Sequence, residues 1–480
     1  MKSHKSLLFL GIAACLFLSS CSGLPKGNTG GGGGNGSLPM SLTLSTVPAS
    51  VPAGISLLSF TVNISGIALT SQNTGTAVNL TPSNPVVDLN KLLSDSAYLG
   101  KFSVASDLLN KIQITITSSA VVFCTSTSGV AGCNAGTIQT VTGGPAVLTF
   151  SYSPALNLTG TGIGVRFRVA MAKALILNTA STAVQSIDFT QPLVAFSEQL
   201  PLAANLTAGQ ADYVEDLTGV VTAVGASSIT LKSATAGTFT ADVSATTSNF
   251  SSQFCSSNTI SCAKINQVAS LDTIVNADGT FALLLFDPFD STSRDWVEGI
   301  IGYAPTSLTQ FQLVVSNFVP AATGSLISSN LHLGDQVTVN LATSPTFAVD
   351  QKNLTAPANT FTGSSSTSVL TPGQVVAVHP TAFTAASGAT PASVTVDSVL
   401  LRYSHLSGNP GTPGPNFQFS AFPAFLGIPA GSQTQETTGV TNYDLGLSGT
   451  TLTTGQATGI RALYLGPPST SFFVVAKARQ

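Results

Sequence analysis

One short stretch of this sequence contains several carboxylate side chains, which together could bind a cation. Asp287, Asp290 and Asp295 follow one another closely, with Arg294 and Trp296 beside them. Calcium takes about six to eight oxygen ligands, many of them from carboxylates on loops. The EF-hand ligand pattern is absent, so the alternative is a solvated linker in which Arg294 pairs locally. The expectation is therefore no metal site and no cofactor, with Asp287, Asp290 and Asp295 as the candidate ligands if calcium binds.

Four cysteines form two close pairs that could bind zinc or form disulfides, Cys124 with Cys133 and Cys255 with Cys262. Structural zinc sites have tighter spacing, such as CxxC, and no histidine lies near either pair. Disulfides form in exported proteins, and short separations make local pairing entropically cheap. We therefore predict two separate disulfides, Cys124–Cys133 and Cys255–Cys262.

Sequence motifs of catalysis are absent from the chain, which has no GxSxG elbow, HExxH or P-loop. His332, His379 and His405 each stand alone in their segments, and we expect them on the surface or at strand edges. A catalytic triad could still assemble from distant segments, because chain order does not fix geometry. The expected protein is nevertheless not an enzyme.

Phenylalanines near the C-terminus could form an aromatic platform for sugars or peptides. Phe417, Phe419, Phe422 and Phe425 lie close together in the sequence. The chain has 26 phenylalanines, which must supply most of the aromatic core. Because single apolar residues are normally structural, we expect these four in the core, and the ligand site stays unknown.

The first residues, 1–20, have the layout of a secretory signal peptide. Lys2 and Lys5 precede an apolar run at 7–18. This run is shorter than the roughly 20 residues that a membrane-spanning helix needs. We therefore expect export and removal of residues 1–20.

Leu18-Ser19-Ser20-Cys21 resembles the lipobox of bacterial lipoproteins, whose cysteine is lipidated and becomes the mature N-terminus. The resemblance implies a palmitate-type lipid on Cys21 that anchors the chain in the bacterial cell envelope. Ser22 at the next position favours the outer membrane. Residues 21–37 are rich in glycine and are expected to form a flexible tether.

The composition favours β-sheets and excludes a nucleic-acid partner. Only 8% of the residues are charged, against about 25% in ordinary soluble proteins. Valine and threonine alternate with small residues, which suits sheets that expose hydroxyls rather than charges. The net charge of −3, with 17 Lys and Arg spread thinly, lacks the basic clusters that nucleic acids require.

Residues 38–206 are expected to form an antiparallel β-sandwich. Strands are predicted at 41–47, 57–70, 111–124, 146–152, 164–177 and 187–196. Phe60, Val62, Ile64 and Ile67 have the spacing of a core-facing side. A short helix or turn is expected at 88–93.

A repeat follows, with three units at 213–293, 294–403 and 404–480. Each has a turn into a strand, Asn266-Gln267, Gly373-Gln374 or Gly455-Gln456, where we expect positive φ. The first two units open on Gly219-Val220 and Gly299-Ile300, and the third lacks a clear counterpart. About five strands per unit predict OB- or SH3-like barrels, with Ig-like sandwiches as the alternative.

Two stretches carry a family resemblance. Residues 60–69, followed by 87–92, resemble an uncharacterised domain of bacterial lipoproteins. The Leu-Thr-x-Gly-Gln turns and the final Val474–Arg479 are similar to a second, small β domain of unknown function. The resemblance implies architecture and location but no activity.

Three functions remain open at this point. The leading expectation is a lipid-anchored envelope protein that acts as a non-catalytic binding or assembly module. The alternatives are an envelope hydrolase acting on glycans or peptides, and a structural spacer without a ligand. The expected partners are the membrane, through the N-terminal lipid, and an envelope protein or glycan.

Overall fold

The computed structural model describes residues 37–480 apart from several short stretches. Those stretches are 49–50, 52–53, 83–85, 106, 128, 135, 159–162, 192–193, 201–208, 308, 357–358, 413–415, 420–421, 429–432, 437–441, 445–451 and 467–472. The predicted signal peptide, Cys21 and the tether up to residue 36 lie outside the described residues.

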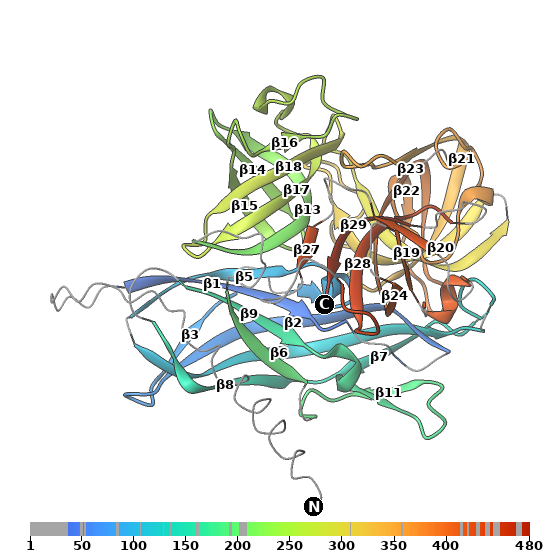
Figure 1. Ribbon diagram of the computed structural model, residues 1–480. Coiled ribbons are helices and arrows are strands. Elements are labelled where there is room, and N and C mark those ends of the chain that lie inside the picture. Colours follow the sequence, from blue (N-terminus) through green and yellow to red (C-terminus); the bar gives the residue numbers. More distant parts are fainter. Residues whose placement is uncertain are drawn as a thin grey trace, which may run out of the picture. The chain divides into compact units, whose positions relative to one another are not determined.

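Two sheets enclose one apolar core in the N-terminal part of the chain (Figure 1, blue to green). The first has the order β12-β9-β1-β5, formed by Ala195–Leu200, Ile163–Val169, Ser37–Thr46 and Ala97–Ala105. The second has the order β3-β2-β6-β7, formed by Ala77–Leu80, Ile55–Ser71, Leu108–Thr125 and Gln139–Gly143. In addition, β4 (Val86–Asp88) pairs with β2, and β8 (Ala146–Asn157) pairs with β6. The predicted sandwich is thus present.

Alternation along β2 directs one side of this strand to the core. Phe60, Val62 and Ile64 are buried, as the period-2 pattern predicted. A register shift between Ile64 and Gly66 moves β2 relative to β6, so Ile67 is buried as well. These residues belong to the core that the two sheets share.

One strand pair of the sandwich is parallel, which corrects the expectation of antiparallel pairing throughout. β1 and β9 run in the same direction, with Leu42 opposite Val165. Between them the chain passes through the second sheet, and β9 then returns to the first sheet in the direction of β1. Parallel pairing needs such a long connection, which local turn signals do not reveal.

Two barrels with the same connectivity follow. The first contains β13 (Gln210–Val224), β14 (Ser228–Ser233), β15 (Gly237–Asp242), β17 (Val268–Asn276) and β18 (Phe281–Asp290), with β16 (Asn249–Phe250) beside β18. The second contains β19 (Trp296–Ser307), β20 (Gln310–Val319), β21 (Gln336–Val349), β22 (Val375–Thr384) and β23 (Ala392–Gly408). In each, the fifth strand pairs in parallel with the third and closes the sheet. This five-stranded arrangement corresponds to the predicted OB-like barrel.

β23 continues from the second barrel into a third without a break. Its residues 403–408 pair with β28 (Thr458–Tyr464), which pairs with β29 (Phe473–Arg479). The third barrel also contains β24 (Pro410–Thr412), β25 (Asn416–Phe419), β26 (Gln433–Glu436) and β27 (Asn442–Asp444). β26 runs parallel to β29 and closes the same circuit. The predicted boundary at residues 403 and 404 therefore lies inside one strand.

The repeated turn has the positive φ that its Asn or Gly residue predicted. Asn266, Gly373 and Gly455 have φ values of 70°, 94° and 77°. The register also identifies the opening glycine that the third unit lacked in the sequence. Gly408 pairs with Thr458 three residues after Gly455, just as Gly299 pairs with Val376 three residues after Gly373.

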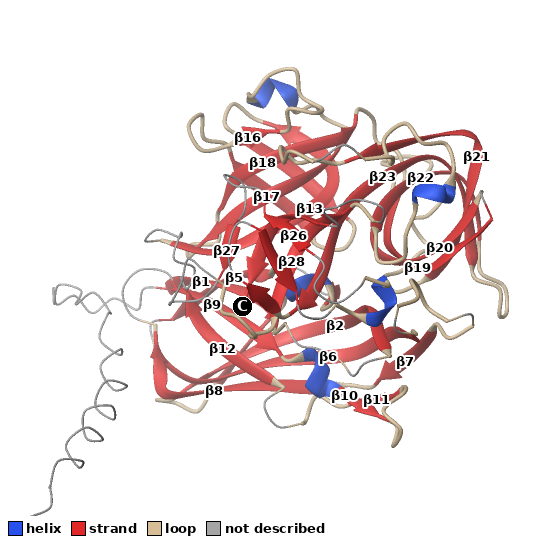
Figure 2. Ribbon diagram, turned by 45° about the vertical axis from the view of Figure 1, so that its right-hand side comes forward, coloured by secondary structure: helices blue, strands red, loops and turns tan. Residues whose placement is uncertain are grey.

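The described helices are short 3-10 turns (Figure 2). They are η1 (Lys91–Leu93), η2 (Met171–Ala174), η3 (Ile260–Cys262), η4 (Thr367–Val369) and η5 (Ala424–Leu426). A separate two-stranded sheet pairs β10 (Leu175–Leu177) with β11 (Val184–Ile187). None of the described helices is long and apolar enough to cross a membrane.

Candidate functional site: a buried ionic cluster

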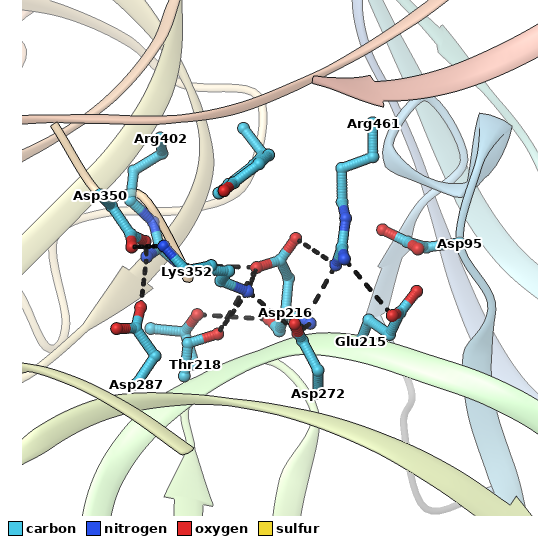
Figure 3. Close-up of polar contacts among 12 residues, drawn as sticks. Asp95, Glu215, Asp216, Thr218, Asp272, Asp287, Asp350, Lys352, Arg402 and Arg461 are labelled. Atoms are coloured by element: carbon cyan, nitrogen blue, oxygen red, sulfur yellow. Dashed lines mark hydrogen bonds and ion pairs between the residues drawn. The ribbon is translucent and has the colours of Figure 1, made fainter. Parts of the chain in front are cut away.

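A continuous network of ion pairs, here called the ionic cluster, joins side chains from the sandwich and all three barrels (Figure 3). Its acidic members are Asp95, Glu215, Asp216, Asp272, Asp287, Glu298 and Asp350, and its basic members are Lys91, Lys352, Arg402, Arg461 and Lys477. The chain has only 17 Lys and Arg and 20 Asp and Glu, so a large share of its charge gathers here.

A bulge in β13 brings two consecutive carboxylates into the cluster. The register between β13 and β17 shifts between Val214 and Leu217, and Asp216 has φ of 54°. In a regular strand, neighbouring side chains point to opposite faces. Because of the bulge, both Glu215 and Asp216 pair with Arg461, at 3.3 Å and 3.2 Å.

Arg402 connects the first and second barrels. Its guanidinium is ion-paired with Asp350, lies 3.3 Å from Oε2 of Glu298 and lies 3.6 Å from Oδ2 of Asp287. The ring centroid of Phe289 is 4.9 Å from Cζ of Arg402, which adds a cation–π contact. Several acceptors therefore replace the water that burial removes.

Lys352 connects the same two barrels through Asp216 and Asp272 of the first barrel. Its Nζ pairs with Asp216, lies 2.9 Å from Oδ1 of Asp272 and donates to Ser270 Oγ at 3.3 Å. A lysine ammonium has three protons, so these three acceptors match its donor capacity.

The last strand ties the sandwich to the first barrel. Lys477 Nζ lies 3.2 Å from Asp95 Oδ1 and 2.6 Å from Glu215 Oε2. Arg479 donates to the main-chain oxygen of Asp95 and to Ser96 Oγ. Lys91, beside Asp95 in the sandwich, pairs with Glu298 of the second barrel at 2.7 Å.

The cations decide which of these carboxyls stay ionised. Burial alone would raise the pKa of Asp216, but Lys352, Arg461 and Arg402 lower it well below its ordinary value. Burial, reinforced by the neighbouring charge of Asp350, instead raises the pKa of Asp287 well above its ordinary value. A hydrogen bond between the carboxyls of Asp287 and Asp350 raises the pKa of Asp287 further, because it needs a proton on one of them.

A cavity of about 100 Å³ lies beside the cluster, between the sandwich and the barrels. Asp95, Asp216 and His405 are among its lining residues. His405 Nδ1 lies 3.0 Å from Ser94 Oγ and 3.5 Å from Asp95 Oδ2. Burial lowers the pKa of His405 to about 4, so the imidazole is neutral at pH 7. This is the one place where the described residues bring three potential metal ligands together.

The three candidate calcium ligands do not converge on a common point. Asp287 belongs to the ionic cluster, whereas Asp290 accepts hydrogen bonds from Arg294 and from Trp296 Nε1. Asp295 accepts from the main chain of 321 and 326 and from Ser325. Each of these carboxylates therefore has its own protein partners.

Both predicted disulfides are present. Cys124–Cys133 and Cys255–Cys262 have Cα–Cα separations of 5.6 Å and 5.5 Å. The first lies at the end of β6, and Cys133 N donates to the main-chain oxygen of Gly302 in the second barrel. The second closes the connection between β16 and β17 and packs against the core of the first barrel.

The histidine expectation is wrong for His405, which is buried within β23 rather than lying at the surface. His379 is also buried and lies 2.7 Å from Asp397, while His332 is exposed. Neighbouring elements cover the outer faces of these strands, which no single segment of sequence can indicate.

Among the four phenylalanines, Phe425 is buried and Phe422 stacks on Phe473, as expected for core residues. The side chains of Phe417 and Phe419 lie outside the described residues.

Sequence reasoning missed the ionic cluster, although a signal for it exists. Arg402 follows Leu400-Leu401 in a long strand, and Lys477 stands within Val474–Ala478. In a chain with so few charges, a cation inside an apolar strand indicates a buried partner of opposite charge. No protein-family model, curated protein or solved structure matches the chain.

Proposed function

We propose that this protein is a lipid-anchored scaffold of the bacterial envelope, which holds several β modules in one fixed arrangement and binds a partner without catalysis. The observation that carries the proposal is the ionic cluster. Its ion pairs cross from the sandwich to the second and third barrels, and from the first barrel to each of the other two. A string of independent modules has no need of such contacts.

Physical reasoning supports a role in fixing geometry rather than in adding stability. Replacing a buried ion pair by packed apolar residues is often neutral or stabilising. Breaking one is strongly destabilising, because a charge is then buried alone. Any other arrangement of the modules would leave buried charges unpaired and would therefore be higher in free energy. A single fixed arrangement suits a protein that presents surfaces to a partner.

The anchor in this proposal is Cys21. Its lipid holds the chain at the membrane, and the Gly-rich tether has a root-mean-square span of about 20 Å. The tether lets the rigid part search for a partner above the outer membrane.

The partner that the surface chemistry favours is a neutral glycan. A groove of about 390 Å³ between the β16–β17 connection of the first barrel and the loop after β21 of the second is lined mainly by hydroxyl and amide side chains. They are Asn249, Ser252, Ser256, Ser257, Asn258 and Asn353. Such groups donate and accept hydrogen bonds without charge, as sugar hydroxyls require.

The hydrolase alternative has less support. Asp287 and Asp290, two carboxylates that such a site could use, line neither the cavity beside the ionic cluster nor the groove lined by Asn249 and Asn353. A hydrolytic site needs a nucleophile or two carboxyls converging on one substrate position.

The anchor is tested by labelling cells with radioactive palmitate. We expect label on the wild-type protein and none on Cys21→Ala; equal labelling would contradict the anchor.

The partner is tested by binding of the full mature protein to an array of envelope glycans. Ser256→Tyr fills the groove, and Ser329→Tyr, in an exposed turn of the second barrel, is the matched control. We expect binding to be lost only in Ser256→Tyr. No glycan binding, or equal binding by both variants, would overturn the glycan proposal and leave an envelope protein as the partner to test.

A further inference from the structure

We propose that Asp95, Asp216 and His405 form a binding site for a zinc-type divalent metal ion, which joins the sandwich to the first and third barrels. This goes beyond the scaffold function and does not depend on a glycan partner. One ligand atom from each residue lies within 4.8 Å of the others. The three come from a loop after η1, from the bulge of β13 and from β23.

An unpartnered oxygen points to a ligand at this place. Oδ2 of Asp95 is buried without a hydrogen bond, although Oδ1 of the same carboxylate is paired with Lys477. Only 5% of the Asp95 side chain is exposed. A buried ionised oxygen without a partner is costly, so a cation supplied from solution would stabilise it.

The separation of two candidate ligands fits metal binding better than a direct hydrogen bond. His405 Nδ1 and Asp95 Oδ2 are 3.5 Å apart, beyond an ordinary N–H···O distance. Two ligands that are each about 2.1 Å from a tetrahedral zinc ion lie about 3.4 Å from each other. Only small shifts would therefore bring both atoms onto one ion.

The remaining ligands are also available. Oδ1 of Asp216 already faces Lys352, Arg402 and Ser270, whereas Oδ2 faces Arg461 and keeps a lone pair for a second partner. The cavity of about 100 Å³ has room for a water molecule as a fourth ligand, since one water occupies roughly 30 Å³. Nδ1 of His405 accepts from Ser94 when the ring proton is on Nε2, and the metal would take the place of the Ser94 hydroxyl.

The charge around the site can accept a cation despite the nearby lysines and arginines. With Arg479, which donates to the main chain of Asp95, counted among the cations, seven carboxylates face six cations, so one carboxylate is in excess when all of them are ionised. Carboxylates combined with imidazole are typical ligands of zinc, whereas calcium and magnesium prefer all-oxygen sites.

The experiment measures metal content of the full mature protein in detergent, after a chelator has been removed and zinc chloride has been supplied. We expect about one zinc ion per chain for the wild type and a loss of most of it in His405→Gln and Asp95→Asn. His332→Gln is the matched control, because His332 Nδ1 also lies 3.5 Å from a carboxylate, Asp335, but is exposed. Unchanged zinc content in His405→Gln and Asp95→Asn would overturn the proposal.

A second measurement avoids variants that fail to fold. The wild-type protein is loaded with Co²⁺, which reports tetrahedral coordination by visible absorption, and X-ray absorption identifies imidazole among its ligands. We expect nitrogen and oxygen ligands with one imidazole. A wild-type protein that binds no metal stoichiometrically, or binds it without imidazole, would contradict the site and leave the scaffold proposal intact.

Discussion

Lys477 Nζ lies 3.2 Å from Oδ1 of Asp95, although the two residues are 382 positions apart in the chain. The last strand of the third barrel is thereby tied to the sandwich. The same ammonium group also pairs with Glu215 of the first barrel, at 2.6 Å. One cation thus joins three modules, and its removal should affect the whole protein.

Lys477→Met should lower the free energy of unfolding by about 3–5 kcal/mol, because Asp95 and Glu215 lose a buried partner. Lys477 is fully buried, whereas Lys264 lies exposed in the first barrel. Lys264→Met is therefore the control, with an expected change within about 0.5 kcal/mol. Urea unfolding of both variants checks the prediction, and equal effects would contradict a structural role for the ionic cluster.

Glu298 should make stability depend on pH in the acid range. Burial alone would raise its pKa, but Lys91 and Arg402 bring the pKa below its ordinary value of 4.5. A lowered pKa in the folded state stabilises the protein above the unfolded-state pKa, and this contribution is lost as the pH falls through the folded-state pKa. The difference in unfolding free energy between wild type and Glu298→Gln should therefore be largest near pH 7 and shrink below about pH 4.5.

Unfolding of both proteins at pH 7 and pH 3 tests this prediction. Asp242→Asn, at an exposed position in β15, is the control and should show a small difference at both pH values. A difference in unfolding free energy between wild type and Glu298→Gln that is larger at pH 3 than at pH 7 would contradict the prediction.

Gly219 should not tolerate a side chain, since a Cβ there would lie 2.2 Å from the main-chain oxygen of Lys232. Gly219→Ala must move the backbone of β14, and we expect a loss of about 1–3 kcal/mol. Gly144→Ala is the matched control, because a Cβ at Gly144 meets nothing within 4 Å. Thermal unfolding should separate the two variants; similar melting temperatures would show that β14 adjusts freely.

The Cys255–Cys262 bridge should stabilise the first barrel by restricting a short loop. Its removal in Cys255→Ala/Cys262→Ala should cost about 2.5 kcal/mol in the chain-entropy model. Unfolding of the double variant measures the cost. Peptide mapping of unreduced wild type should give the two local bridges, and free thiols or a Cys124–Cys255 link would contradict them.

Local features of this protein were determined by its sequence. The buried side of β2, the positive φ of Asn266 and the pairing of Cys255 with Cys262 all depend on residues close together in the chain. Side-chain alternation, turn conformation and short-loop closure are local properties, so they could be predicted without knowledge of the fold.

Only the tertiary structure decided which elements pack against the outward-facing side chains of each strand. Asp95, Asp216 and His405 lie in segments far apart, and nothing near them in the sequence indicates that they meet. β23 likewise continues through two barrels because it pairs with β22 in one barrel and with β28 in the next. Burial of a charge requires partners from elsewhere in the chain, so the ionic cluster exists only once the modules have packed together.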